Sequence, residues 1–71
     1  MNKLETLIDN FANGNLSDAK KQAKRFSAAR LREGMIELGW EPNKASLAAI
    51  YLKGGMEFQE YCDQEFALRE K

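Results

Sequence analysis

Apolar residues recur at helical spacing from the beginning of the chain. Four of them in the first segment follow the i, i+3, i+4, i+7 pattern of one helix face: Leu4, Leu7, Ile8 and Phe11. Asn2 can cap the start of this helix, with Glu5 three residues later as in a capping box. Gly14 can end it, because glycine readily adopts the left-handed conformation that follows many helices. The pattern predicts a helix over about residues 3–12.

The next part of the chain has an apolar stripe whose phase changes near Ser27. The first set of apolar positions contains Ala19, Ala23 and Phe26, and the second contains Ala28, Leu31, Met35 and Leu38. Ser17 and Ser27 are both favourable N-caps. We therefore predict helices over residues 18–26 and 28–38, although one curved helix is the alternative. Gly34 weakens the second of these helices by about 1 kcal/mol relative to alanine, and a glycine there often lets another helix come close.

Glycine and proline mark the boundaries of the remaining segments. Gly39 can end one helix, and Pro42 suits the first position of the next. Between Asn43 and Lys53 apolar residues surround the helix axis, which is typical of a helix at the centre of its fold or between partners. A final apolar stripe consists of Phe58, Tyr61, Cys62 and Phe66. These patterns predict helices over about residues 43–53 and 56–69.

The predicted fold is all-α, a compact bundle of four or five short helices in a single domain over residues 1–71. No segment has the pattern of a strand, and valine is absent. The expected core consists of Leu4, Leu7, Ile8, Phe11, Ala23, Phe26, Leu31, Met35, Leu38, Ala48, Leu52, Phe58, Tyr61, Cys62 and Phe66. A chain of 71 residues is near the lower limit for one stable core, so self-association into a homodimer is an expected source of stability.

The composition argues against most enzymatic chemistry. The chain has no histidine and a single cysteine, Cys62, so it lacks the usual general base, the usual catalytic triads and any Cys/His zinc site. Cys62 lies among aromatic residues and is interpreted as a buried structural thiol. We predict no enzyme, no metal and no cofactor. We also predict a cytoplasmic protein without membrane contact, because no signal peptide or bilayer-length apolar run is present.

The charges cancel overall but are segregated along the chain. There are 11 basic and 11 acidic residues. Residues 18–32, the basic segment, carry six cations against Asp18 alone: Lys20, Lys21, Lys24, Arg25, Arg30 and Arg32. The last predicted helix is acidic. The first interpretation of the basic segment is that it is a solvated helix face, or that it pairs with the acidic helix within the fold or across a dimer. The second interpretation is that it contacts nucleic-acid phosphates.

The segment ELGWEPNKASLAAIYLKGG, residues 37–55, has the outline of a helix-turn-helix motif but few groups that read DNA bases. Only Asn43, Lys44 and Ser46 near the start of its second helix are suited to that task. We therefore favour a structural corner between two helices. Trp40 within this corner is either a lid over the core or an anchor for a partner, and Tyr51 raises the same alternative.

Two stretches, FANGNLSDAKKQAKRFSAARLREGMIELGW and KASLAAIYLKGGMEFQEYCDQEF, resemble small early or accessory proteins of tailed phages and prophages. The resemblance implies a protein that binds and inhibits or redirects a host or defence protein, as anti-CRISPR proteins and nuclease inhibitors do. The expected function is thus a non-enzymatic protein-binding module, and the alternative is a small helix-turn-helix-like nucleic-acid-binding regulator that uses the basic segment. The predicted partner-binding residues are Trp40, Tyr51, Lys20, Lys21, Lys24, Arg25, Arg30 and Arg32.

Overall fold

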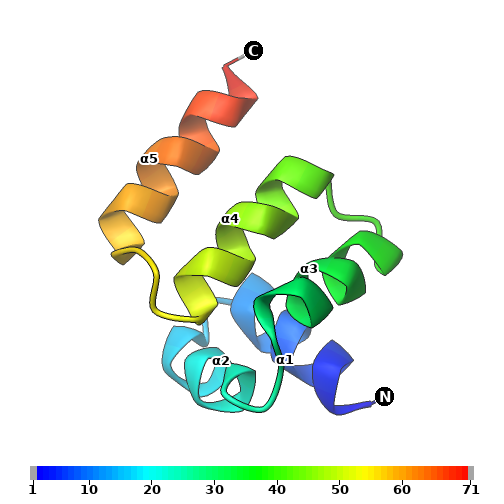
Figure 1. Cartoon of the computed structure of the whole chain (residues 1–71). Coiled ribbons are helices and arrows are strands. Elements are labelled where there is room, and N and C mark those ends of the chain that lie inside the picture. Colours follow the sequence, from blue (N-terminus) through cyan, green and yellow to red (C-terminus); the bar gives the residue numbers. More distant parts are fainter. Residues whose placement is uncertain (1, 71) are drawn as a thin grey trace.

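Five α-helices and no strand occupy residues 2–70, the part of the chain that the computed structural model describes (Figure 1). The helices are α1 (Lys3–Ala12), α2 (Leu16–Ala23), α3 (Ala28–Glu37), α4 (Pro42–Leu52) and α5 (Phe58–Arg69). The most extensive packing is that of α3 on α4, followed by α1 on α2 and α4 on α5. The predicted all-α fold is therefore confirmed, and α4 lies between α5 and the other helices.

Side-chain caps fix two of the helix starts. Asn2 Oδ1 accepts a hydrogen bond from the Glu5 backbone N–H at 2.8 Å, and Ser27 Oγ accepts one from the Arg30 N–H at 3.1 Å. Each bond satisfies one of the backbone donors that a helix start leaves unpaired. The predicted break at Ser27 is therefore present. Residues 24–26 do not extend α2, because their N–H groups bond three residues back in a tightened last turn.

The predicted cap by Ser17 is wrong, because α2 begins earlier. The Asn15 N–H donates to the Asn10 carbonyl at 2.8 Å, which completes the turn after α1. Asn15 is then already the N-cap residue, and its carbonyl accepts from the Ala19 N–H. Ser17 consequently lies inside the first turn of α2.

The end of α3 determines where Trp40 lies. Gly39 has a φ of 96° and donates its N–H to the Ile36 carbonyl, while the Trp40 N–H donates to the Met35 carbonyl at 3.0 Å. This pair of bonds is the Schellman arrangement, which requires a left-handed residue at the position of Gly39. The ends of α1 and α4 carry the same two bonds. The chain therefore reverses within a few residues after each of these helices, and Trp40 is folded back onto the bundle.

The core is formed by one face of α1 together with small or apolar residues of the other helices. Its buried members are Leu4, Leu7, Ile8, Phe11, Ala19, Ala23, Leu31, Met35, Ala45, Ala48, Ala49, Tyr51, Leu52 and Tyr61. The alanine side chains of α4 are small, so the neighbouring helices can approach it closely. No charged or polar residue is buried in the described part of the chain.

Three of the predicted core residues are wrong. Leu38, Phe58 and Phe66 are 49%, 43% and 60% exposed, whereas Phe26 and Cys62 are partly buried. Leu38 follows the last residue of α3 that packs inward. The two phenylalanines are exposed because α5 packs mainly on the single helix α4, which buries only Tyr61 of α5. Within residues 2–70, none of the helices is long and apolar enough to cross a membrane.

Candidate functional site

Trp40 covers one end of the core. Its ring is half-buried and lies 6.0 Å from the ring of Phe11, centroid to centroid. The ammonium group of Lys44 lies 4.9 Å from the Trp40 centroid, a cation–π distance. These contacts agree with the lid interpretation, although part of the indole remains exposed. Trp40 is thus attached to the core and still accessible from outside.

Tyr51, in contrast, is an internal residue. It is 5% exposed, and its ring lies within 6.0 Å of the rings of Phe11, Phe58 and Tyr61. The ammonium group of Lys20 lies 4.6 Å from the Tyr51 centroid. The burial of Tyr51 leaves little of its ring for a partner, so the prediction of Tyr51 as a contact residue lacks support in this structure.

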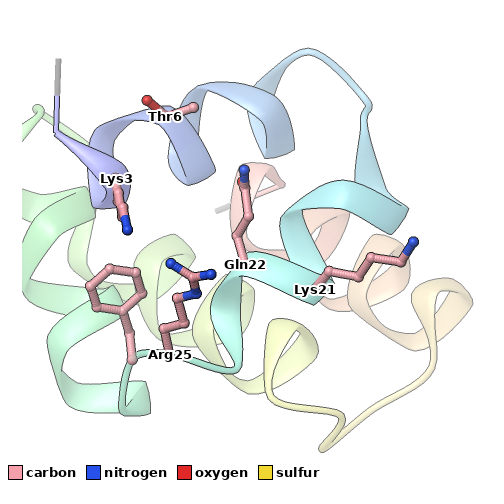
Figure 2. A pocket seen from close by; sticks show the side chains of 6 residues that line it. Lys3, Thr6, Lys21, Gln22 and Arg25 are labelled. Carbon is pink, nitrogen blue, oxygen red and sulfur yellow. The ribbon is translucent and has the colours of Figure 1, made fainter.

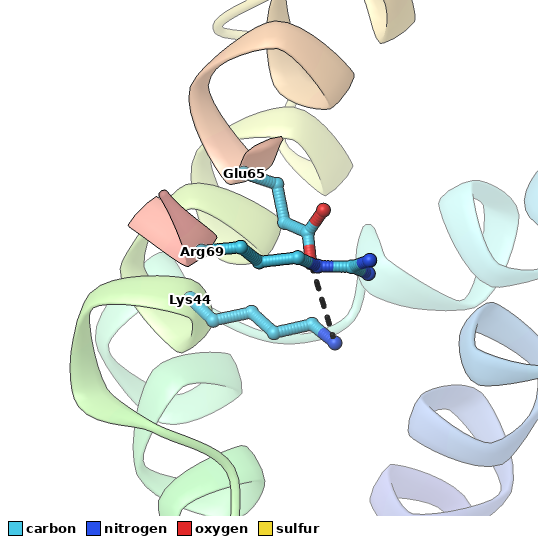
Figure 3. A network of polar contacts seen from close by, with 3 residues as sticks. All are labelled: Lys44, Glu65 and Arg69. Atoms are coloured by element: carbon cyan, nitrogen blue, oxygen red, sulfur yellow. Dashed lines mark hydrogen bonds and ion pairs between the residues drawn. The ribbon is translucent and has the colours of Figure 1, made fainter. Parts of the chain in front are cut away.

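A small polar network connects α5 to α4 beside Trp40. Glu65 Oε1 accepts a hydrogen bond from Arg69 Nε at 2.8 Å and lies 3.9 Å from Lys44 Nζ (Figure 3). Burial and the nearby Glu65 carboxylate together raise the pKa of Tyr61 to about 12. Trp40, Lys44, Tyr61 and Glu65 line a surface groove of about 280 Å³ where α1, α4 and α5 meet.

The basic segment forms no ion pair with the acidic α5. Both ion pairs found among residues 2–70 are those of Glu65 with Lys44 and Arg69. Arg32 Nε instead donates to Ser46 Oγ at 2.6 Å, and Lys20 lies over Tyr51. The other four cations of the segment are exposed: Lys21, Lys24, Arg25 and Arg30. Pairing of this segment with α5 inside one chain is therefore not observed in the described residues.

The second helix of the predicted helix-turn-helix outline is α4, which lies inside the fold. α4 packs against α2, α3 and α5, so most of its surface is covered. Of the residues suited to reading bases, Ser46 accepts the bond from Arg32, and Lys44 lies between Glu65 and Trp40. Asn43 is the one of these three residues that is exposed. This arrangement favours the structural corner over a DNA-reading helix.

A polar pocket of about 330 Å³, the α1–α2 pocket, opens between the start of α1 and the end of α2. Its lining residues are Lys3, Thr6, Lys21, Gln22, Arg25 and Phe26 (Figure 2). Lys21 and Arg25 were singled out from the sequence as part of the basic segment. Lys3 was not, because it lies 18 residues before Lys21 and no spacing rule connects them. Only the packing of α1 on α2 brings them to the same pocket.

A second feature lies on α5. Phe58, Cys62 and Phe66 are spaced i, i+4, i+8 and therefore share one side of the helix, which we call the α5 apolar face. Both phenylalanines are exposed and Cys62 is half-buried with a free thiol. The sequence pattern identified this stripe correctly but assigned it to the core.

Comparisons of the chain with protein-family models, with curated protein sequences and with solved structures find no match. Within the described residues, no group of three or more histidine, cysteine, aspartate or glutamate side chains is placed to hold a metal ion. The surface features that can carry a function are therefore the α5 apolar face, the groove beside Trp40 and the α1–α2 pocket.

Proposed function

We propose that the chain is a non-enzymatic protein-binding module that contacts its partner through the α5 apolar face. The observation that carries this proposal is the exposure of Phe58 and Phe66 on a helix whose main contact is α4 alone. Full burial of one such phenyl side chain is worth about 1.5–3 kcal/mol. A small domain that leaves two of them exposed on one helix side retains apolar surface that a partner can cover.

The charges beside this face indicate the chemistry of the partner. Asp63 and Glu70 lie three residues before and four residues after Phe66, so they border it on the helix surface. Both are exposed, and neither takes part in an ion pair among residues 2–70. A complementary surface would be apolar at its centre and basic at its rim. Phe58 also lines the groove that contains Trp40, so a large partner can contact the α5 apolar face and the groove together.

The biological role within this proposal comes from the resemblance to small proteins of tailed phages. A cytoplasmic, phage-encoded accessory protein would use the α5 apolar face to bind and inhibit or redirect one host or defence protein. Occlusion by a rigid helix needs no catalytic group, which agrees with the absence of histidine from the chain. A second copy of the chain is another possible occupant, because the basic segment of that copy offers the complementary charge.

Substitution of Phe66 tests the proposal without disturbing the core. Phe66→Ser removes a side chain that is 60% exposed, so the variant should retain its fold. Leu38→Ser is the matched control, because Leu38 is similarly exposed but lies at the end of α3. Both variants and the wild type are used as bait in bacterial host lysate, and a recovered protein is then purified and titrated.

The expected result is one protein that binds the wild type and Leu38→Ser with equal Kd and Phe66→Ser at least tenfold more weakly, a difference of about 1.4 kcal/mol. Equal binding by Phe66→Ser, or no specific partner for the folded wild type, would count against the proposal. Light scattering on the free protein identifies the homodimer, which should dissociate in Phe66→Ser if the second copy occupies the same face.

The alternative function is nucleic-acid binding through the basic segment. It is favoured by one observation, the four exposed cations of that segment that pair with no acid in the described residues. Titration of duplex DNA at two salt concentrations tests it, since each phosphate contact steepens the dependence of affinity on salt. Binding that weakens steeply with salt and survives Phe66→Ser would support the alternative, and absence of binding at low salt would remove it.

A further inference from the structure

We infer that the α1–α2 pocket binds a nucleoside 5′-monophosphate group, with the phosphate between Lys3 and Arg25. The pocket lies on α1 and α2, whereas the α5 apolar face belongs to a helix that packs mainly on α4 (Figure 1). The inference therefore rests on different residues from the proposed function, and either can fail without the other.

The first observation is the convergence of two cations. In Figure 2 the ammonium group of Lys3 and the guanidinium group of Arg25 point toward each other across the pocket, while Lys21 points away. None of the acidic residues among residues 2–70 lines this pocket. Two like charges directed into one space repel each other, and an anion between them converts the repulsion into two attractions. The arrangement thus favours a negatively charged ligand.

Five other cations of the chain contact a partner, whereas three cations of the basic segment, like Lys3 and Arg25, contact none in the described residues. Lys44 and Arg69 share Glu65, and Arg32 donates to Ser46. Lys20 lies over the Tyr51 ring, and Lys53 Nζ donates to the Ala23 carbonyl at 3.2 Å. Lys3 and Arg25 make no such contact in the described residues, although both point into a concave site. A guanidinium group is well suited to hold two phosphate oxygens at once.

The polar neighbours add a donor and an acceptor. Gln22 Oε1 accepts a hydrogen bond from Asn10 Nδ2 at 3.1 Å, which leaves the Gln22 amide N–H groups as the donors available to a ligand. Thr6 Oγ1 donates its hydrogen to the Asn2 carbonyl at 3.0 Å, so its oxygen can only accept. A bare phosphate dianion has no hydrogen to offer Thr6, but the hydroxyl groups of a ribose do. The polar groups therefore suit a sugar phosphate better than inorganic phosphate.

The size of the pocket and its apolar wall extend the argument to a nucleoside. The half-buried Phe26 lines the pocket, and an aromatic ring is a stacking surface that accepts any base. A volume of about 330 Å³ lies at the small end of ligand pockets, which suits a single nucleotide. The same group occurs as a free nucleotide and as the phosphorylated 5′ end of a nucleic acid.

The test is a titration of the isotope-labelled protein followed by amide chemical shifts. Adenosine 5′-monophosphate should cause saturable shifts at residues 3–6 and 21–26, whereas adenosine should cause none that saturate. Arg25→Gln and Lys3→Gln should each weaken binding about tenfold or more, because each removes a charge-assisted contact. Arg30→Gln is the control, since it makes the same change of charge at an exposed position outside the pocket, and it should alter the Kd less than about twofold.

Two short oligonucleotides separate the sources of the group. Stronger binding of a 5′-phosphorylated oligonucleotide than of the free nucleotide, with no binding of its 5′-hydroxyl form, assigns the site to nucleic-acid ends. Equal binding of both oligonucleotides would overturn the inference in favour of diffuse backbone contact. An equal effect of Arg30→Gln and Arg25→Gln, or no saturable shift up to about 10 mM nucleotide, would also overturn it.

Discussion

Gly34 of α3 lies directly against Leu4 of α1. A Cβ atom added at position 34 would lie 2.6 Å from Leu4 Cδ2 and 3.3 Å from Ile8 Cδ1, both on buried side chains. The glycine therefore lets α1 and α3 approach more closely than any other residue would. This close approach explains why a residue unfavourable to helices stands in the middle of α3, as its position in the sequence suggested.

We predict that Gly34→Ala destabilises the protein by about 1–2 kcal/mol. The added methyl group overpacks the contact with Leu4, which costs about 1–3 kcal/mol, while the helix gains up to about 1 kcal/mol from alanine. Urea denaturation of Gly34→Ala, Leu4→Ala and the double variant measures the coupling. The double variant should be more stable than the sum of the single effects predicts, because the new methyl group then fills space vacated by Leu4. An increase in stability for Gly34→Ala alone would contradict the close contact.

Trp40→Ala should lower the free energy of unfolding by about 1–3 kcal/mol. The ring of Trp40 packs on Phe11 at 6.0 Å but is only half-buried, so the loss is smaller than for a fully buried tryptophan. Circular dichroism during thermal unfolding measures the change, with Leu38→Ala as a control that should stay within about 0.5 kcal/mol of the wild type. If Trp40→Ala were equally neutral, Trp40 would be a surface residue rather than a lid on the core.

Glu65→Gln should loosen α5 more than it lowers global stability. Glu65 is the shared partner of Lys44 on α4 and Arg69 on α5, but both cations are solvent-exposed. The expected loss is therefore at most about 1 kcal/mol and should shrink at high salt. Amide hydrogen exchange is the appropriate measurement, because faster exchange in α5 than in α1–α4 reports local opening. Glu33→Gln, the same change at an exposed position of α3 without an ion pair, should leave exchange in α5 unchanged.

Local chemistry explains which features were predictable from the sequence. The apolar face of α1, the caps at Asn2 and Ser27 and the glycine ends of α1, α3 and α4 all depend on residues within a few positions of one another. Such short-range patterns fix helix boundaries to within one or two residues. Ser17 misled the prediction because the turn after α1 already placed Asn15 as the N-cap.

Relationships between helices were harder to predict. The apolar stripe of α5 was recognised, but its spacing does not reveal that α4 alone would cover this helix and leave Phe58 and Phe66 exposed. Lys3 and Arg25 line the same pocket only because α1 packs on α2, which the sequence pattern does not reveal. Both candidate binding surfaces therefore contain residues whose role follows from the tertiary structure rather than from the sequence pattern.

Alkaline pH should destabilise the protein through Tyr61. Burial, aided by the Glu65 carboxylate, raises the pKa of Tyr61 to about 12 in the folded state from about 10 in the unfolded state. The folded state thus holds this proton more tightly, so its contribution to stability is complete below about pH 10 and is lost as pH rises toward 12. Because solvent partly screens the Tyr61 hydroxyl group, the loss is smaller than the full pKa shift implies, on the order of 1 kcal/mol. Denaturation of the wild type and of Tyr61→Phe across this pH range separates the titration of Tyr61 from that of the lysines, since only the wild type carries the Tyr61 hydroxyl group. The difference in free energy of unfolding between the two proteins should be constant below pH 10. Above pH 10 the free energy of unfolding of the wild type should fall faster than that of Tyr61→Phe. A constant difference across the whole range would show that the pKa of Tyr61 is the same in the folded and unfolded states.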